Sequence, residues 1–291
     1  MIHAKSGDDY FLQQIVATFT GTVHSVFKHA LNIRSDGNDE IFTLATKAMD
    51  RAPNTLVIDL DTLDHLGIQQ HDRVSVRHNE LLIEEKLKIA IPKASRWQCQ
   101  LPIYPANCTR LKMNMIRVKQ FIDLHGKGGG IKRNDSPVSE FEAETSRLLQ
   151  QRTTLLYEEI LNQRLDRFQA YAADLVGLGP GLTPSGDDFL VGLFAIIHLQ
   201  NSPCSMYKPL CESVIKVIQP LTNEISFTTL KKAAYGQVRE SICSFIHAIL
   251  YGTEVESIEA LRKVLAIGSS SGTDIALGLI SGLEANIKLG G

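Results

Sequence analysis

The chain has 291 residues, of which 44% are hydrophobic and 21% charged, so it is long enough for two globular domains with cores of their own. Its 30 lysines and arginines against 32 acidic residues exclude the basic field that attracts nucleic acids and anionic membranes. The five cysteines form no C-x-x-C pair, no apolar run is long enough to span a bilayer, and the start lacks a signal peptide, which predicts a cytoplasmic protein with reduced thiols.

The first hundred residues are predicted to form short β-strands. Extended runs separated by turn residues lie at Val16–Phe27, on both sides of the turn Ser35–Asp39, at Thr55–Ile58, at Arg73–Arg77 and at Leu81–Glu85. Asp61 is expected to cap a short helix that ends at Gly67. Several short strands at this spacing predict a small β-barrel or a curled sheet.

Helical periodicity replaces this pattern after a crossing segment, Trp97–Pro105, that holds two prolines. Helices are predicted at Leu111–Leu124, from the capping box Ser139–Glu142 to about Leu175, and then at 185–200, 206–218, 224–235, 237–251, 256–266 and 272–288. The predicted fold class is α+β with two domains. A small β-barrel-like domain at 1–105 precedes an all-α domain at 106–291 with an internal repeat of a helix start.

The two repeated helix starts are Ser185–Leu193 and Ser271–Leu279. Both read S-G-x-D-x-x-x-G-L, and each follows a loop rich in glycine or serine. The serine suits an N-cap, the aspartate suits a first-turn position where the helix dipole favours negative charge, and the second glycine lets another helix approach closely. We predict that the two N-termini converge, with Gly192 and Gly278 near the crossing. The alternative is a favourable helix start that simply occurs twice.

The segment Gly177–Asp188, G-L-G-P-G-L-T-P-S-G-D-D, is the strongest candidate for a functional site. Its alternating glycines permit positive φ and a close approach of backbone to ligand, while its two prolines stiffen it. The N–H groups of such a loop suit an anion or a carbonyl oxygen. Asp187 and Asp188 are expected to have low pKa values at a helix start, and together with Asp274 they would repel a bare phosphate.

Three arrangements would relieve that repulsion. A divalent metal could bridge the acids and the ligand, a basic residue could join the site, or the acids could orient the N–H groups of an amide or carbamoyl ligand. No H-E-x-x-H or C-x-x-C pattern is present. We therefore predict no definite cofactor and keep Mg²⁺ as an alternative.

Two other segments are weaker candidates. Asn223 and Ser226 are either site residues or part of a helix cap. The loop His125–Arg133 holds four glycines and three basic residues but lacks the G-K-[ST] of a Walker loop. It is interpreted as a flexible connector, with a mobile flap that attracts anions as the alternative.

These motifs resemble the AllH-type family. Residues 177–188 match its G-x-G-P-G-L-T-P-S-G-D-D motif, residues 222–226 its T-x-x-I-S, residues 233–236 its A-x-x-G and residues 270–274 its S-S-G-x-D, in that order. The family often has a histidine directly before these serines, whereas this chain has Ser269 after Gly268. The family includes a subunit of oxamate carbamoyltransferase, a three-subunit enzyme of allantoin and purine degradation that interconverts oxalurate plus phosphate with oxamate plus carbamoyl phosphate.

The resemblance implies a carbamoyltransferase subunit whose ligands are carbamoyl phosphate, oxamate or oxalurate and whose partners are other enzyme subunits. The predicted catalytic residues are Asp187, Asp188 and Asp274. The predicted substrate-binding residues are Gly179, Gly181, Thr183, Ser185, Gly186, Asn223, Ser226, Ser270, Ser271, Gly272 and Thr273. No metal ligand is predicted. Two alternatives remain, a non-catalytic ligand-binding or scaffold subunit and a Mg²⁺-dependent hydrolase that uses the three aspartates.

Overall fold

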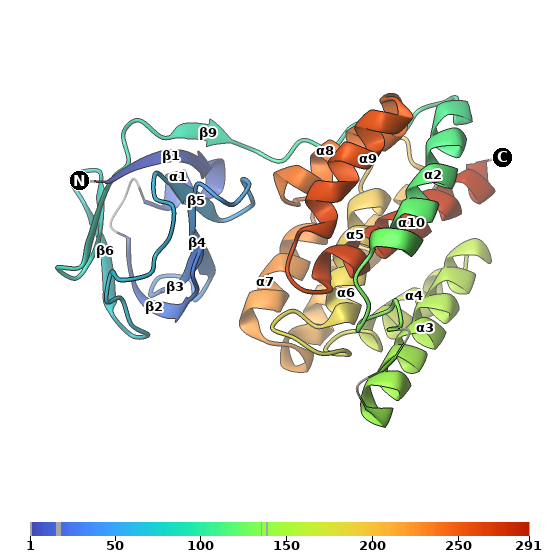
Figure 1. The fold of residues 1–291 in the computed structure, drawn as a ribbon, viewed down its shortest axis with the longest axis horizontal. Helices are drawn as coiled ribbons and strands as arrows, with labels where there is room; N and C mark the ends of the chain where they lie inside the picture. The colour runs from blue at the N-terminus through green and yellow to red at the C-terminus, as the bar shows by residue number, and fades with distance from the viewer. Residues whose placement is uncertain (1, 16–18, 135, 138, 291) are drawn as a thin grey trace. The chain divides into compact units, whose positions relative to one another are not determined.

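The computed structural model describes residues 2–15, 19–134, 136–137 and 139–290 (Figure 1). The chain forms two compact units, Met1–Cys99 and Gln100–Gly291. Within the described residues, no helix combines the length and the apolar character needed to cross a membrane.

The first unit is a closed β-barrel. Its strands pair in the order β5-β4-β3-β2-β6-β7-β8-β1, and β1 pairs back onto β5 (Figure 1). A further strand, β9 (Ser95–Trp97), adds to β1 in parallel. The eight barrel strands are β1 (Ile2–Asp8), β2 (Thr20–Val26), β3 (Ala30–Ser35), β4 (Ile41–Thr46), β5 (Thr55–Ile58), β6 (Arg73–Arg77), β7 (Glu80–Ile83) and β8 (Leu87–Ala90).

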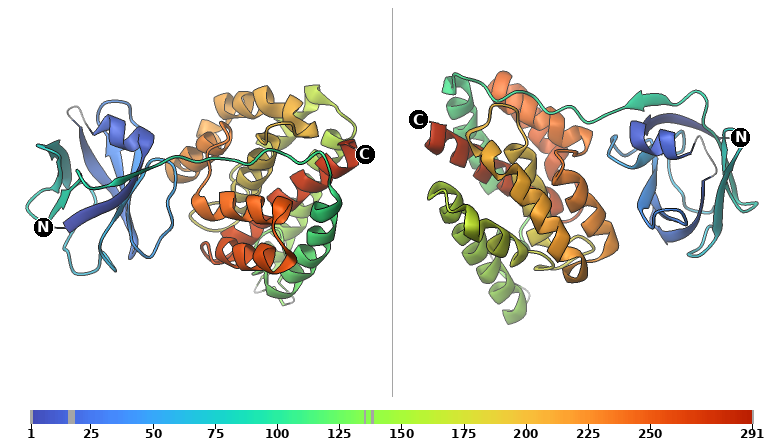
Figure 2. Two further views of the ribbon diagram at one scale, coloured as in Figure 1. Left: turned by 90° about the horizontal axis from the view of Figure 1, so that it is seen from above. Right: turned by 180° about the vertical axis from the view of Figure 1, so that it is seen from behind.

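Buried aliphatic side chains together with Phe11, Phe19 and Phe42 form the barrel core. Figure 2 shows the barrel strands from two further directions. The short helix α1 (Asp9–Gln14) contributes Phe11, whose ring lies 4.7 Å from the Phe42 ring and 5.9 Å from the Phe19 ring, centroid to centroid. Such aromatic contacts add to the stabilisation from apolar burial. The predicted small β-barrel is therefore confirmed.

Two details of the barrel differ from the sequence prediction. The helix expected after Asp61 does not form, and this prediction is wrong. The Thr62 hydroxyl donates to Asp64 Oδ2 and accepts from the Asp64 N–H, which replaces helical hydrogen bonding locally, and His65 adopts a positive φ of 69°. Of the predicted run Val16–Phe27, residues 16–18 lie outside the described residues, and β2 occupies Thr20–Val26.

The second unit is helical, as predicted. Its α-helices are α2 (Thr109–His125), α3 (Glu140–Leu161), α4 (Leu165–Ala173), α5 (Ser185–Ile197), α6 (Lys208–Ile218), α7 (Glu224–Ala233), α8 (Glu240–Tyr251), α9 (Glu254–Leu265) and α10 (Ser271–Gly290). Two 3₁₀ turns, η1 (Pro203–Tyr207) and η2 (Gln219–Leu221), flank α6.

The helices α5 and α10 form the centre of this unit. Every residue of α5 is buried. The backbones of the two helices touch where each carries its repeated glycine, because a Cβ at Gly192 would collide with the Ile275 carbonyl oxygen and one at Gly278 with the Phe189 carbonyl oxygen. The predicted crossing at these two glycines is confirmed.

Candidate functional site

The N-termini of α5 and α10 meet and exchange side-chain contacts. The Thr183 and Ser271 hydroxyls, from the two different helix starts, lie 2.9 Å apart, and Thr183 also donates to Asp188 Oδ2 at 3.0 Å. The Ser271 hydroxyl reaches Asp188 on α5, and the Ser185 hydroxyl lies beside Asp274 on α10. Each helix start therefore places its serine next to the aspartate of the other, and the predicted convergence is confirmed.

The two repeated serines are not N-caps, contrary to the prediction. The N-cap of α5 is Pro184, without a capping side chain, and Ser185 is the first helical residue. Ser271 likewise is the first residue of α10. The Asp188 N–H donates to the Pro184 carbonyl and the Asp274 N–H to the Ser270 carbonyl, which are the first backbone bonds of the two helices. The hydroxyls are thereby left to face the opposite helix.

The prediction of low pKa values for the aspartates is also wrong. Burial raises the pKa of Asp188 to about 8 and that of Asp274 to about 6, and it raises the pKa of Asp187 as well. The loss of water outweighs the hydroxyl and backbone donors around these carboxyls, and the nearby carboxylates raise the pKa of Asp188 further. Near neutral pH, the neighbouring Asp188 and Asp274 thus hold one proton between them.

Asp187 faces a different set of residues from the other two aspartates. Its Oδ1 accepts from the Gly177 N–H at 2.7 Å, and its Oδ2 accepts from the hydroxyls of Thr222 at 2.5 Å and Ser226 at 2.6 Å. Asn223 caps α7 by accepting from the Ser226 N–H at 3.0 Å, and it donates to the Leu182 carbonyl. Asp187, Asn223 and Ser226 thus hold the glycine-rich loop and α7 against α5.

Asp187→Asn is expected to lower the free energy of unfolding by about 2–3 kcal/mol. The amide has one acceptor oxygen instead of two, so it leaves buried donors unsatisfied and loses charge-assisted bonds. Urea denaturation measures the change. Asp166→Asn, at an exposed first-turn position of α4, is the control and should change stability by only a few tenths of a kcal/mol. Equal midpoints for wild type and Asp187→Asn would show that Asp187 has no such role.

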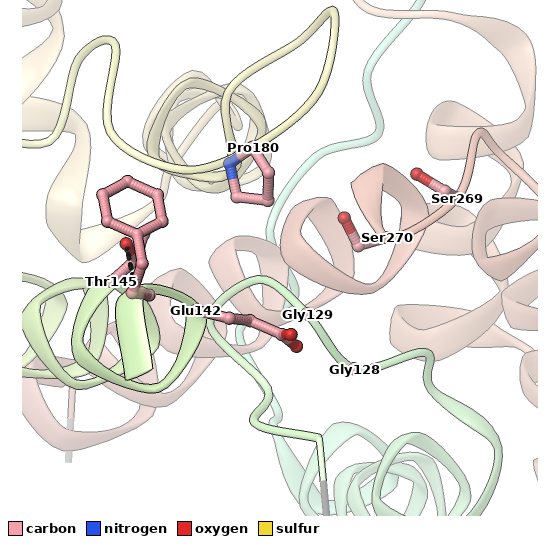
Figure 3. Close-up of a pocket in the computed structure, with 8 residues that line it drawn as sticks. Gly128, Gly129, Glu142, Thr145, Pro180, Ser269 and Ser270 are labelled. Atoms are coloured by element: carbon pink, nitrogen blue, oxygen red, sulfur yellow. Dashed lines mark hydrogen bonds between the residues drawn. The ribbon is translucent and has the colours of Figure 1, made fainter. Parts of the chain in front are cut away.

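A pocket of about 380 Å³ lies beside the two helix starts. Four segments surround it: the loop 125–133, α3 with Glu142 and Thr145, the loop before α5 with Pro180, and the residues Ser269 and Ser270 before α10 (Figure 3). The remaining lining residues are Gly128, Gly129 and Phe141.

The glycine-rich loop 125–133 forms one wall of this pocket. The Ile131 N–H donates to Asp274 Oδ1 at 2.9 Å, and the Lys127 N–H donates to the Thr273 hydroxyl at 2.8 Å. The Lys132 ammonium caps the C-terminus of α2 by donating to the carbonyls of Ile122, Asp123 and Gly126. In this structure the loop is therefore bonded to both α2 and α10, which the interpretation as a plain connector does not account for.

Most of the predicted site residues do not line the pocket. Of those residues, only Ser270 lines it. Buried at the two helix starts are Ser185, Gly186, Asp188, Gly272, Thr273 and Asp274. Sequence reasoning missed the lining residues of α3, and the four glycines of the loop were the one signal for that side of the pocket.

No described residues form a group of three or more histidines, cysteines, aspartates or glutamates placed to hold a metal ion. Both oxygens of Asp187 are engaged by protein donors. Of the three aspartates at the helix starts, Asp188 and Asp274 are therefore the two left as candidate metal ligands.

Comparison with known families covers both units. Residues 175–283 match the family described as oxamate carbamoyltransferase subunit AllH, and residues 3–96 match the AllH family N-terminal domain. The chain belongs to the AllH family. No solved structure matches it.

The AllH match spans both helix starts and the residues that bind Asp187. It begins at Leu175, whose carbonyl oxygen packs directly against Gly186, and it ends at Leu283 within α10. The loop 125–133 and α3 fall outside both AllH matches, although they line the pocket. The pocket residues Pro180, Ser269 and Ser270 thus lie within the AllH match, whereas those of the loop 125–133 and α3 do not.

Proposed function

We propose that this chain is the AllH-type subunit of an oxamate carbamoyltransferase, and that the pocket beside α5 and α10 binds a substrate. The observation that carries the proposal is the meeting of the two helix starts of the AllH match next to a pocket and above the carboxyl pair Asp188 and Asp274. A helix N-terminus such as that of α10 favours the carboxylate or phosphate that these substrates carry. Other enzyme subunits are the proposed partners.

The proposed reaction needs a proton acceptor. When the amide nitrogen of oxamate attacks the carbamoyl carbon of carbamoyl phosphate, a C–N bond forms, the C–O bond to phosphate breaks, and the nitrogen loses a proton. Low-pKa carboxylates accept protons poorly, whereas a carboxyl with a pKa near the working pH is suited to the task. A pair with pKa values of about 6 and about 8 supports this role for Asp188 and Asp274.

The proposal also covers the setting of the reaction. The pathway that the family name suggests is allantoin and purine degradation. The compartment that we propose is the cytoplasm, where the cysteines would stay reduced.

The test is transfer by the assembled enzyme. Oxalurate and phosphate formation from oxamate and carbamoyl phosphate is measured with the other subunits present, for wild type, Asp188→Asn and Asp274→Asn. Each substitution is expected to lower kcat at least about 100-fold, in keeping with the loss of a general acid–base group. Asp166→Asn, exposed on α4, is the matched control and should retain full activity.

The outcomes separate the alternatives. Wild-type turnover in both Asp188→Asn and Asp274→Asn would remove the catalytic role of the pair. Full activity of the partner subunits without this chain would favour a scaffold role. Phosphate release that depends on Mg²⁺ and occurs without oxalurate formation would favour a hydrolase.

A further inference from the structure

Two buried polar atoms at the helix starts, Ser185 Oγ and Asp274 Oδ2, lack a well-aligned hydrogen bond among the described residues. The hydroxyls of Ser185 and Ser270 lie near enough to the Asp274 carboxyl to lower its pKa, but Oδ2 receives no well-aligned donor. The second oxygen of Asp274 is satisfied by the Ile131 N–H. An unsatisfied buried polar atom costs about 1–3 kcal/mol, so these two atoms are a cost of the free structure that a donor would remove.

Two glycines lie close to these atoms. A Cβ built on Gly130 would lie 2.6 Å from Ser185 Oγ and 2.6 Å from Asp274 Oδ1, and it would collide with Asp274 Oδ2. A Cβ on Gly179 would lie 2.9 Å from Ser185 Oγ. The chain neighbours of these two glycines, Gly129 and Pro180, line the pocket. Ser185 Oγ and Asp274 Oδ2 therefore lie next to two glycines whose chain neighbours line the pocket.

The chemistry of the two atoms selects the group that would satisfy them. A carboxylate oxygen can only accept a hydrogen bond, and a hydroxyl can also accept one. A single group with two N–H donors on one nitrogen serves both acceptors at once. The –NH₂ of a primary amide or carbamoyl group has this form, whereas a carboxylate, a phosphate or a methyl group offers no donor.

We propose that Ser185 and Asp274 form an amide-binding subsite that Gly130 and Gly179 cover in the free chain. The H₂N–C=O group of the ligand enters from the pocket, and its two N–H groups donate to Ser185 Oγ and to Asp274 Oδ2. In the proposed function, this subsite would recognise the amide end of the substrate, and the identity of the physiological ligand rests on that function. The amide preference itself is measurable on the isolated chain.

The contacts of the loop 126–131 allow it to uncover the subsite. The described hydrogen bonds that hold it to the α10 side come from the Ile131 N–H, the Lys127 N–H and the Lys127 ammonium, which donates to the Gly268 carbonyl at 3.0 Å. If the loop withdraws, the Asp274 carboxylate loses the Ile131 donor on Oδ1 and gains a ligand N–H on Oδ2, so the number of its donors is unchanged. The base of the loop stays in place, because Lys132 holds it to the end of α2.

The test compares oxamate with pyruvate, which has the same carboxylate and carbonyl but a methyl group in place of –NH₂. Isothermal titration calorimetry on the purified chain gives the ratio of the two Kd values. We expect wild type to bind oxamate at least about 30-fold more tightly, because a site built for N–H donors rejects an analogue that lacks them. Ser185→Ala should reduce the ratio about tenfold, and Asp274→Asn should reduce it further. Ser213→Ala, on α6, should leave it unchanged.

Each outcome decides the proposal. Similar affinities in wild type, no binding of either compound, or an unchanged ratio in Ser185→Ala would overturn the subsite. Circular dichroism establishes that each variant is folded, and Ser185→Ala alone decides if Asp274→Asn does not fold. If the chain prefers oxamate but the assembled enzyme transfers no carbamoyl group, the subsite is supported and the proposed function is refuted. Transfer without that preference would remove the subsite alone.

Discussion

Asp188→Asn is expected to gain stability relative to wild type as the pH rises from about 4.5 to 8. The carboxyl of Asp188 is buried in the folded state, where its pKa is raised to about 8, but it is in water in the unfolded state, with a pKa near 3.9. Between these values the folded state holds a proton that the unfolded state has released. The wild-type chain therefore loses stability as the pH rises through this window, and an asparagine at this position does not.

The expected size of the gain is on the order of 4 kcal/mol, because each unit of pKa difference is worth about 1.4 kcal/mol. Asp274, with a pKa of about 6, contributes in the same direction but only between roughly pH 4 and 6. The Asp274 carboxylate contributes to the raised pKa of Asp188, so part of the expected gain depends on Asp274 being ionised.

Urea denaturation at intervals of half a pH unit measures this difference. The informative quantity is the change with pH of the free-energy difference between Asp188→Asn and wild type, since any fixed cost of the substitution cancels. Asp166→Asn, whose carboxyl is exposed on α4, should run parallel to wild type at every pH. Parallel curves for Asp188→Asn and wild type would show that the Asp188 carboxyl is not held protonated by burial.

Gly278→Ala is expected to destabilise the chain by about 3 kcal/mol or more, and Gly192→Ala by a similar amount. At both positions a Cβ would collide with a backbone carbonyl oxygen of the facing helix, so α5 and α10 must separate along their buried length. The gain of about 0.5–1 kcal/mol for alanine over glycine in a helix opposes this cost but does not cancel it. The two effects should also couple, because both substitutions act at the same crossing.

Gly282→Ala is the matched control for these substitutions. It lies on α10 as well, but the nearest atom to its Cβ would be the Ile196 Cβ at 2.8 Å, whereas a Cβ at Gly278 would lie closer than this to a backbone oxygen, so a smaller shift relieves the contact at Gly282. Thermal and urea unfolding should place Gly282→Ala clearly above Gly278→Ala in stability. If Gly192→Ala and Gly278→Ala both stay within 1 kcal/mol of wild type, the close crossing is not what holds the two helices together.

The strands with clear local patterns could be predicted, whereas β1 could not. Ile2–Asp8 holds Lys5, Ser6 and Gly7, which show neither alternation nor β-branching, yet Ser6 and Asp8 are buried. The reason is tertiary, since β1 pairs with β5, β8 and β9 and closes the barrel. The strand β1 is stabilised by pairing with strands that are distant in the sequence, so a local stretch of sequence does not predict it. The helix predicted at Asp61–Gly67 fails for a different reason. The sequence there favours a helix start, but the hydrogen bonds between Thr62 and Asp64 replace helical bonding.

The position of the site in the chain could be predicted from the sequence, but the burial of its side chains could not. The repeat of Ser185–Leu193 in Ser271–Leu279 predicted that the two helix starts lie together. Each copy carries a glycine that allows a close helix crossing, and the two glycines could serve the same crossing. The repeat did not reveal how deeply the aspartates are buried, and depth reverses the direction of their pKa shift. The loop 125–133 carries no counterpart in the repeat, so its position against Asp274 had no local signal beyond its glycines.

The exchange of serines between the two helix starts has a consequence for the origin of the site. Each repeat supplies the hydroxyl beside the carboxyl of the other, and each glycine touches the backbone at the matching place on its counterpart. This is the arrangement that two identical peptides would adopt about a dyad. Such an arrangement fits a duplication of one helix start, and among the described residues the bond from the Ile131 N–H to Asp274 is one place where the two halves differ.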